Sequence, residues 1–490
     1  MRARTPDLTE IFMSNKTSFY ILTDTHFVSK NAWVEGKPFT LRERGDQIAM
    51  KLSPEILDSF IEKILADSET DTVIFTGDNV NNGDMVSHYD FREKLERLVS
   101  AGKKVYVTTA THDYCGMDDD ENFFKACRYT ETGTEPAECM RKAGLFDFYE
   151  KYGPAQALSV HRESGSYIVR VGEKTRLAMI NDNGNGRSHC GLFEDGFNWL
   201  REQVADAKAN GDYMLFAVHH PVIAPWELYR KAVEFELYGG YKELSEFMCA
   251  EKVRAVFTGH VHVQNIRKYE SENGGYFYDI ATIAAVNAAG KMRKVTVDEE
   301  NGICKVESTG IEKISGFDTG DLSARDYLYG INLPGLVEKL LPLALTDYDK
   351  FLELGEGALP VDKLKKHKFL VRFAVKKFYK MTVYTAAKLG KIKKKLTAEQ
   401  KEYAKNTPLS KTAFTIFAHV FPGDAPYTPD TVENIALTAA AKRLDRLVSR
   451  FKISAVQNLI PEGSSLADML QDFLYNNRTG SDDEIEINLN

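Results

Sequence analysis

The segment SFYILTDTH (residues 18–26) joins an apolar run to two side chains that bind metals well, Asp24 and His26. Aromatic and branched side chains dominate the run SFYILT (18–23), which favours a buried strand. Four later runs have the same character: DTVIFT (71–76), KKVYVT (103–108), YMLFAV (213–218) and RAVFT (254–258). Amphipathic stretches at residues 53–68 and 88–102 have apolar positions at helical spacing. This alternation of strand and helix predicts α/β layers.

Two other parts of the chain depart from this alternation. Residues 166–181 and 276–309 have the pattern of hairpin-forming strands, punctuated by turns such as DEENGIC. Beyond about residue 320 the patterns are helix-like only, with no further strand signal. We therefore predict a mixed α/β (α+β) region that is followed by an all-helical domain.

Length and composition narrow the class of protein. A chain of 490 residues with 43% hydrophobic and 27% charged residues is typical of a soluble globular protein of two or three domains. The net charge of −8 gives no global argument for nucleic-acid binding. The six cysteines are scattered without a CxxC pair, so we expect reduced thiols. Neither a signal peptide nor an uncharged apolar run of about 18 residues is present, and the expected location is cytoplasmic.

Histidine and aspartate residues follow the predicted strands. In order along the chain these are Asp24 and His26, Asp78, His112 and Asp113, His219 and His220, and His260 and His262. Ligands of open α/β sheets bind at the carboxyl ends of the strands, so we expect these side chains to converge. Imidazole and carboxylate ligands without thiolates favour Mn, Fe, Zn, Co or Ni. Two such ions about 4 Å apart can clamp an in-line displacement at phosphorus.

The ordered motifs resemble those of the calcineurin-like dinuclear metallophosphoesterases. That family has D-x-H, G-D, G-N-H-D, H and G-H-x-H in this order. The corresponding segments here are Asp24-Thr25-His26, Gly77-Asp78, Ala110-Thr111-His112-Asp113, His219 and Gly259-His260-Val261-His262. The resemblance covers roughly residues 17–310 and implies a two-sheet sandwich flanked by helices, a fold that agrees with the mixed strand and hairpin pattern.

The resemblance also implies a role for each motif residue. Asp24, His26 and His262 would hold one metal, His219 and His260 a second, and Asp78 would bridge the two. A metal-bound hydroxide would attack phosphorus. His112 would lie near the leaving group, and Asp113 would orient its imidazole.

Thr111 departs from the family pattern, because it occupies the place of the motif's asparagine. A threonine hydroxyl is shorter than an asparagine amide and a poorer donor to a divalent ion. We expect the second metal site to be weaker for this reason. A plain loop role for Thr111 is the alternative.

Three further polar residues are candidates for substrate binding. His220 can contact phosphate or pack against Pro221, and Asp182 and Asn183 lie in a turn-rich segment that can flank the metals or form a simple polar turn. Residues 115–160 include a long connection and are a candidate cap insertion.

The predicted domain boundaries follow from these patterns. They are an N-terminal extension (1–16), a catalytic domain (17–315), a linker (316–330), a helical accessory domain (331–475) and an acidic tail (476–490) that we expect to be frayed. Residues 363–405 carry fifteen Lys and Arg against two Glu, interleaved with aromatic residues. This basic run can bind an anionic membrane surface or a polyanion, or it can be a solvated lysine face over an aromatic core.

The first functional hypothesis is a metal-dependent phosphoesterase that hydrolyses a small phosphodiester, or a monoester. The alternative is a metal-binding scaffold with weak or no hydrolysis, whose helical domain binds a partner or a membrane; Thr111 is its best support. A nuclease ranks lower, because the basic run lies outside the predicted catalytic domain.

Overall fold

The computed structural model describes residues 16–115, 126–183, 190–288, 290–451, 460, 463–475 and 480–490. Nearly all of the predicted N-terminal extension (1–16) and residues 116–125 of the candidate cap insertion lie outside these ranges. The domain boundaries drawn from the sequence remain predictions.

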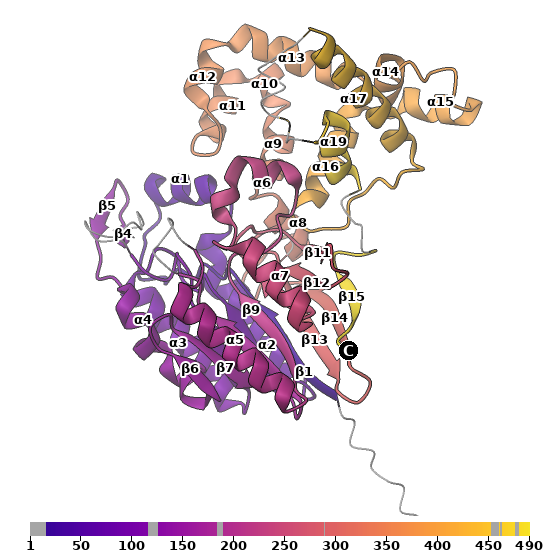
Figure 1. Ribbon diagram of the computed structural model, residues 1–490. Coiled ribbons are helices and arrows are strands. Elements are labelled where there is room, and N and C mark those ends of the chain that lie inside the picture. Colours follow the sequence, from indigo (N-terminus) through magenta and orange to yellow (C-terminus); the bar gives the residue numbers. More distant parts are fainter. Residues whose placement is uncertain are drawn as a thin grey trace, which may run out of the picture.

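Two sheets form the centre of the molecule (Figure 1). The first sheet has six strands in the order β15 (Glu484–Asn488), β14 (Ile303–Gly310), β13 (Lys291–Asp298), β1 (Lys16–Leu22), β2 (Thr72–Thr76) and β3 (Lys104–Thr108). The second has seven, in the order β11 (Asn265–Glu270), β12 (Tyr276–Ala281), β10 (Ala255–Thr258), β9 (Tyr213–Val218), β8 (Thr175–Ile180), β7 (Ser166–Arg170) and β6 (Ser159–His161). The strands β4 (Cys127–Tyr129) and β5 (Thr134–Pro136) form a separate small hairpin.

The strands that carry the predicted ligands run parallel within their sheets. In the first sheet β1, β2 and β3 are parallel neighbours. In the second sheet β8, β9 and β10 are parallel neighbours. Since parallel strands end at the same edge of a sheet, the polar segments that follow them are brought to one side of the sandwich.

Apolar side chains fill the space between the sheets and cover their outer faces. Phe19 of β1 and Phe257 of β10 meet edge to face between the sheets, with ring centroids 6.1 Å apart. The helices α2 (Ser53–Ala66) and α3 (Met85–Ser100) cover the first sheet, and α5 (Glu194–Ala209) and α7 (Tyr241–Glu251) cover the second. The predicted two-sheet sandwich flanked by helices is confirmed.

The C-terminal region is helical, as expected. Its helices are α8 (Ala324–Tyr329), α9 (Leu333–Leu340), α10 (Leu343–Thr346), α11 (Tyr348–Gly355), α12 (Val361–Lys366), α13 (Lys368–Lys380), α14 (Val383–Leu389), α15 (Ala398–Asn406), α16 (Leu409–Val420), α17 (Val432–Phe451) and α19 (Leu466–Leu474). Within the segment predicted as a linker, α8 buries Ala324 and Leu328 in the core of the first sheet's outer layer. That segment is therefore packed against the sandwich.

The helical region also contacts the sandwich through the helices α1 (Lys37–Asp46) and α6 (Glu227–Val233). Lys37 at the start of α1 pairs with Glu356 at 2.8 Å. Trp226, which precedes α6, stacks on Phe473 of α19 with ring centroids 5.5 Å apart. Across the residues that the structure describes, no helix has the length and apolar character needed to span a membrane.

The expectation of a frayed acidic tail is wrong for residues 480–490. Here the chain returns to the sandwich, and β15 pairs antiparallel with β14 at the edge of the first sheet. Ile487 is 1% exposed in the core between the sheets. Asp482 is fully buried and accepts a hydrogen bond from the backbone N–H of Ile266 at 3.0 Å. The acidic composition did not reveal the alternating isoleucines of EIEIN, which bury one face of this strand.

The contribution of β15 can be measured with two neighbouring substitutions. We expect Ile487→Ala to lower the free energy of unfolding by about 2–5 kcal/mol, because it leaves a cavity between the sheets. Glu486→Ala is the matched control, since Glu486 is exposed on the opposite face of the same strand. Urea denaturation followed by circular dichroism measures both. Equal stability of the two variants would show that β15 does not contribute to the core.

Candidate metal centre

Five of the six predicted metal ligands adopt a left-handed backbone conformation. Their φ angles are 49° for Asp24, 37° for His26, 49° for Asp78, 65° for His260 and 53° for His262. Asp and His tolerate this conformation better than most residues, yet it still costs free energy, and such residues cluster at functional sites. At each strand exit the chain turns sharply and directs a polar side chain toward the same edge of the sandwich.

Asp24, His26 and His262 form the first group of donors. The Nε2 atoms of His26 and His262 lie 3.0 Å apart, and Asp24 Oδ1 lies 3.8 Å and 3.3 Å from them, respectively. The other carboxylate oxygen of Asp24 accepts hydrogen bonds from Thr23 Oγ1 and from the backbone N–H of His260. Asp24 therefore presents Oδ1 to the two imidazoles.

Asp78, His219 and His260 form the second group. Asp78 Oδ2 lies 3.0 Å from His219 Nε2. The Nδ1 of His219 lies 3.0 Å from the backbone carbonyl of Thr76, which accepts its proton and leaves Nε2 as a donor to a metal. Asp78 also lies with His26 in a third overlapping group, and it is therefore adjacent to both of the other groups.

The donor set fits two divalent cations. Donor atoms about 2.1 Å from a common ion are separated by distances like those found here. The ring nitrogen His219 Nε2, which faces Asp78 in the second group, is buried and has no hydrogen-bond partner in the described part of the chain. Burial, together with the neighbouring His262, lowers the pKa of His26 to about 4, so its imidazole is neutral.

The buried carboxylates are ionised. Burial by itself would raise the pKa of Asp78, but the imidazoles of His219 and His112 hold that pKa well below its usual value. The pKa of Asp24 is likewise lowered, because His219 and His262 outweigh the effect of burial. The same two carboxylates outweigh burial and raise the pKa of His219 to about 9, so the anionic oxygens at this edge attract positive charge.

His112 lies beside the metal ligands, as the sequence predicted. Its ring centroid is 4.7 Å from that of His26, and its backbone N–H donates to Asp78 Oδ1 at 2.8 Å. The Oδ1 of Asn82 lies 3.2 Å from His112 Nδ1. The contact with Asn82 fixes the orientation of the His112 ring beside the metal ligands.

The prediction that Asp113 orients the His112 imidazole is wrong. The carboxylate of Asp113 accepts hydrogen bonds from the backbone N–H groups of Val80 and Ala110 and from the side chain of Asn79. Burial, reinforced by the Asp78 carboxylate, raises the pKa of Asp113 to about 7. Asp113 braces the loop that carries His112 and does not touch the imidazole.

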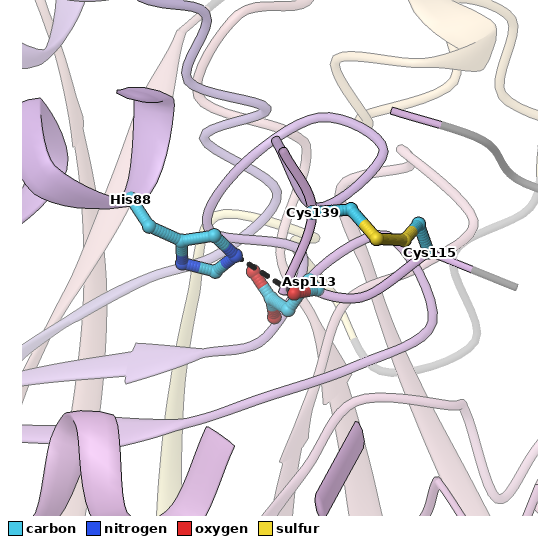
Figure 2. The surroundings of a disulfide bond; sticks show 4 residues. All are labelled: His88, Asp113, Cys115 and Cys139. Atoms are coloured by element: carbon cyan, nitrogen blue, oxygen red, sulfur yellow. Dashed lines mark hydrogen bonds between the residues drawn. A yellow bond between two sulfur atoms is a disulfide. The ribbon is translucent and has the colours of Figure 1, made fainter. Parts of the chain in front are cut away.

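His88 and a disulfide support the same loop (Figure 2). The Nε2–H of His88 donates to the backbone carbonyl of Asp113 at 2.8 Å, and its Nδ1 lies 2.7 Å from the hydroxyl of Tyr149. On the other side of Asp113, Cys115 and Cys139 are joined in a disulfide. The expectation of reduced thiols is therefore wrong for these two residues, whereas Cys127, Cys190, Cys249 and Cys304 are not disulfide-bonded. The sequence spacing did not reveal this pair, because Cys139 comes beside Cys115 only through contacts of the folded chain. Cys139 pairs with Asp84 in an isolated β-bridge, and the backbone N–H of Cys115 donates to the carbonyl of Met140 at 3.1 Å, with α4 (Lys142–Tyr149) following directly.

Thr111 lies next to His112 on this braced loop and is 1% exposed. Its position in the chain puts it beside the second donor group, because the following N–H donates to Asp78. A contribution of its hydroxyl to metal binding remains a prediction.

Two of the three predicted substrate-binding residues, Asp182 and His220, are hydrogen-bonded to each other. Asp182 Oδ2 accepts hydrogen bonds from the backbone N–H and from Nδ1 of His220, at 2.8 Å and 2.9 Å. Both residues are almost fully buried, which argues against direct substrate contact. The His220 ring lies 4.1 Å from that of His260, so the pair supports the second donor group. Asn183 differs, because it lines a cavity.

Two residues of the site were not singled out from the sequence. Glu236, in the turn after α6, lies with Oε2 2.7 Å from His260 Nε2 and so leaves Nδ1 of that ring for a metal. No motif marks this glutamate. Asn82 has a weak signal, since Asn followed by Gly83 is typical of a turn with left-handed backbone, and its φ is 58°.

The contact between Glu236 and His260 predicts that removal of the Glu236 carboxylate weakens metal binding. Carboxylates that hold a metal-binding imidazole typically contribute about 10–100-fold to metal affinity. We expect Glu236→Ala to weaken Mn²⁺ binding by about this factor, as measured by titration calorimetry of metal-free protein. Glu234→Ala is the matched control from the same turn, because Glu234 is exposed and contacts Tyr241. Unchanged affinity in Glu236→Ala would contradict the assignment.

Comparisons with known proteins agree with this geometry. A family model described as calcineurin-like phosphoesterase matches residues 17–264, about half of the chain. No curated protein matches. Among solved structures, a dimetal phosphatase from Danio rerio is 12% identical, with a TM-score of 0.43, over 60% of this chain and 96% of its own. A purple acid phosphatase from yellow lupin (Lupinus luteus) is 14% identical, with a TM-score of 0.40, over 62% and 53%, respectively. Since the matched range contains every strand exit that carries a metal-ligand motif, the chain belongs to the calcineurin-like phosphoesterase family and is a metal-dependent phosphoester hydrolase.

Proposed function

We propose that this protein hydrolyses a small anionic phosphodiester with the help of two divalent ions, for which Mn²⁺ is the first candidate. The convergence of buried carboxylates and imidazoles into adjoining donor groups carries this proposal. Asp24, His26 and His262 would hold one ion, and His219 and His260 the other. Asp78 would bridge them, because it belongs to donor groups on both sides.

The two ions, when bound, would activate a water molecule and neutralise charge on the phosphoryl oxygens. The protein's own contribution is to position the substrate and the proton. His112 would place Nε2 near the leaving oxygen and donate a hydrogen bond or a proton to it. Asn82 and the backbone contact with Asp78 fix the orientation of His112. The buried loop around Asp113 keeps this residue in place during turnover.

A cavity next to this loop supports a small anionic substrate. It has a volume of about 410 Å³, within the range of small-molecule sites, and its lining includes Arg141, Lys142 and Asn183. The Nδ2 of Asn183 donates to the backbone carbonyl of Thr109, two residues before Thr111. The cavity therefore adjoins the loop that carries His112. We propose that it receives one of the organic groups of the ester and that its cations favour a negatively charged group.

The measurement that tests the proposed function is hydrolysis of bis(p-nitrophenyl) phosphate against added Mn²⁺. We expect turnover by the natural sequence and its loss when the metal is chelated or when Asp78 is replaced by asparagine. We expect Thr111→Asn to reach half-saturation at lower Mn²⁺, since an amide oxygen is a better donor than a hydroxyl. Calorimetric titration of Mn²⁺ would report the same shift without turnover.

The opposite result is equally informative. If the protein binds Mn²⁺ tightly but hydrolyses neither this diester nor p-nitrophenyl phosphate, the proposal fails in favour of a metal-binding scaffold. Faster hydrolysis of the monoester than of the diester would retain the hydrolase and contradict the preference for diesters.

The cations that line the cavity predict a preference for anionic substrates. We expect Arg141→Ala to raise KM about tenfold for a diester that carries an additional anionic group, with little change in kcat, because an exposed charge contributes to binding and not to the chemical step. Lys174→Ala is the control, since Lys174 is exposed at the opposite end of β8. Steady-state kinetics measure both. An equal KM in the two variants would show that the cavity does not bind the substrate.

The cytoplasmic location remains a prediction. The Cys115–Cys139 disulfide weighs against it, because disulfides persist mainly in oxidising compartments. The buried cysteines Cys190, Cys249 and Cys304, which are not disulfide-bonded, are compatible with either environment.

A further inference from the structure

Helix α13 (Lys368–Lys380) has apolar side chains on two opposite faces. One face packs into the helical region, where Val375 is 6% exposed and Val371 and Tyr379 lie against the same cluster. The other face presents Phe369, Leu370 and Phe373, which are 86%, 63% and 52% exposed. An amphipathic helix that only covers a core would carry polar residues on its outer face. Packing within the described part of the chain therefore does not explain the outer face of α13.

The exposed apolar residues form one patch. Phe369 and Phe373 are four residues apart and lie one above the other along the helix. Leu370 is adjacent on the wheel of the helix. Monomeric soluble proteins seldom place two phenylalanines and a leucine together in solvent, and such patches mark sites of interaction.

Cations surround this patch. Arg372, Lys376, Lys377 and Lys380 belong to the same helix and are exposed, and Lys365 and Lys366 precede it at the end of α12. The Nζ of Lys377 lies 5.5 Å from the ring centroid of Phe373. Of the fifteen Lys and Arg between residues 363 and 405, all within the described chain, only Lys368 lies within 4 Å of a carboxylate, that of Asp349. Among the described residues, the positive charge of this run is therefore mostly unpaired.

We propose that the outer face of α13 docks on an anionic lipid surface, with Phe369, Leu370 and Phe373 inserted among the acyl chains and the lysines at the level of the headgroups. An interfacial helix combines these two elements, because burial of apolar side chains and attraction to anionic lipids act together. A soluble polyanion would bind the lysines but would not bury the exposed leucine. The helices α12 and α13 lie at the end of the helical region away from the sheets, where a flat surface can reach them (Figure 1).

The test is sedimentation of the full-length protein with vesicles. We expect binding to vesicles that contain phosphatidylglycerol in phosphatidylcholine, much weaker binding to phosphatidylcholine alone, and a decrease as salt is added, since salt screens the attraction. No binding to the anionic vesicles would overturn the proposal.

Two sets of substitutions separate the apolar and electrostatic contributions. We expect the triple change Phe369→Ser, Leu370→Ser and Phe373→Ser to weaken binding by about tenfold or more. Neutralisation of Lys376, Lys377 and Lys380 to glutamine should weaken it roughly a hundredfold, at about fivefold for each lysine. The matched charge control neutralises Lys174, Lys242 and Lys313, which are exposed on the sandwich. Leu158→Ser is the apolar control, because Leu158 is 51% exposed there.

Hydrolysis of the diester in solution should be unchanged in every variant, which also shows that each is folded. Three outcomes would overturn the proposal. If the control variants lose vesicle binding as strongly as the α13 variants, the attraction to the vesicles is not specific to α13. Binding to heparin that exceeds vesicle binding and ignores the serine changes would replace the lipid by a soluble polyanion. A dimer in light scattering that the serine changes abolish would assign the face to a second copy of this chain.

Discussion

Burial of two carboxylates beside several imidazoles at one edge of the sandwich is the constraint on which the site depends. Asp24 and Asp78 are almost completely shielded from water and remain ionised, because imidazoles surround them. A buried charge costs several kcal/mol unless it is paired or coordinates a metal. The ring nitrogen His219 Nε2, which has no hydrogen-bond partner among the described residues, lies in the same place. Divalent cations bound between the two carboxylates and the imidazoles that face them would offset the cost of burying this charge.

The same constraint extends into the backbone. Ligands with left-handed conformations at the exits of β1, β2 and β10 can persist only where surrounding contacts hold them. On the loop after β3, that support comes from the Asp113 carboxylate, the His88 imidazole and the Cys115–Cys139 disulfide. These groups are not ligands, yet they determine where His112 is placed. Rigid support of this kind is what positions a catalytic side chain to within a fraction of an ångström.

The helical region and the sandwich are joined at more than one point. The chain leaves the first sheet after β14, forms the helices, and comes back to add β15 beside β14. The edge strand of the first sheet is therefore supplied by the segment that follows the helices. The helical region contacts the sandwich near both of its ends, through α8 and through α19.

The sequence by itself determined the kinds of side chain at the site, their order, and their positions after predicted strands. These are local properties, because strand periodicity and motif spacing lie in consecutive residues, and the alternation of strands with helices indicates α/β layers. The two-sheet fold and the cluster of donors could be predicted for this reason. Tertiary structure alone decided that Asp113 braces a loop, that Glu236 holds His260, and that the acidic tail forms a strand. Each of these depends on a partner distant in sequence, and a side chain's hydrogen bonds are determined by which segments meet in space.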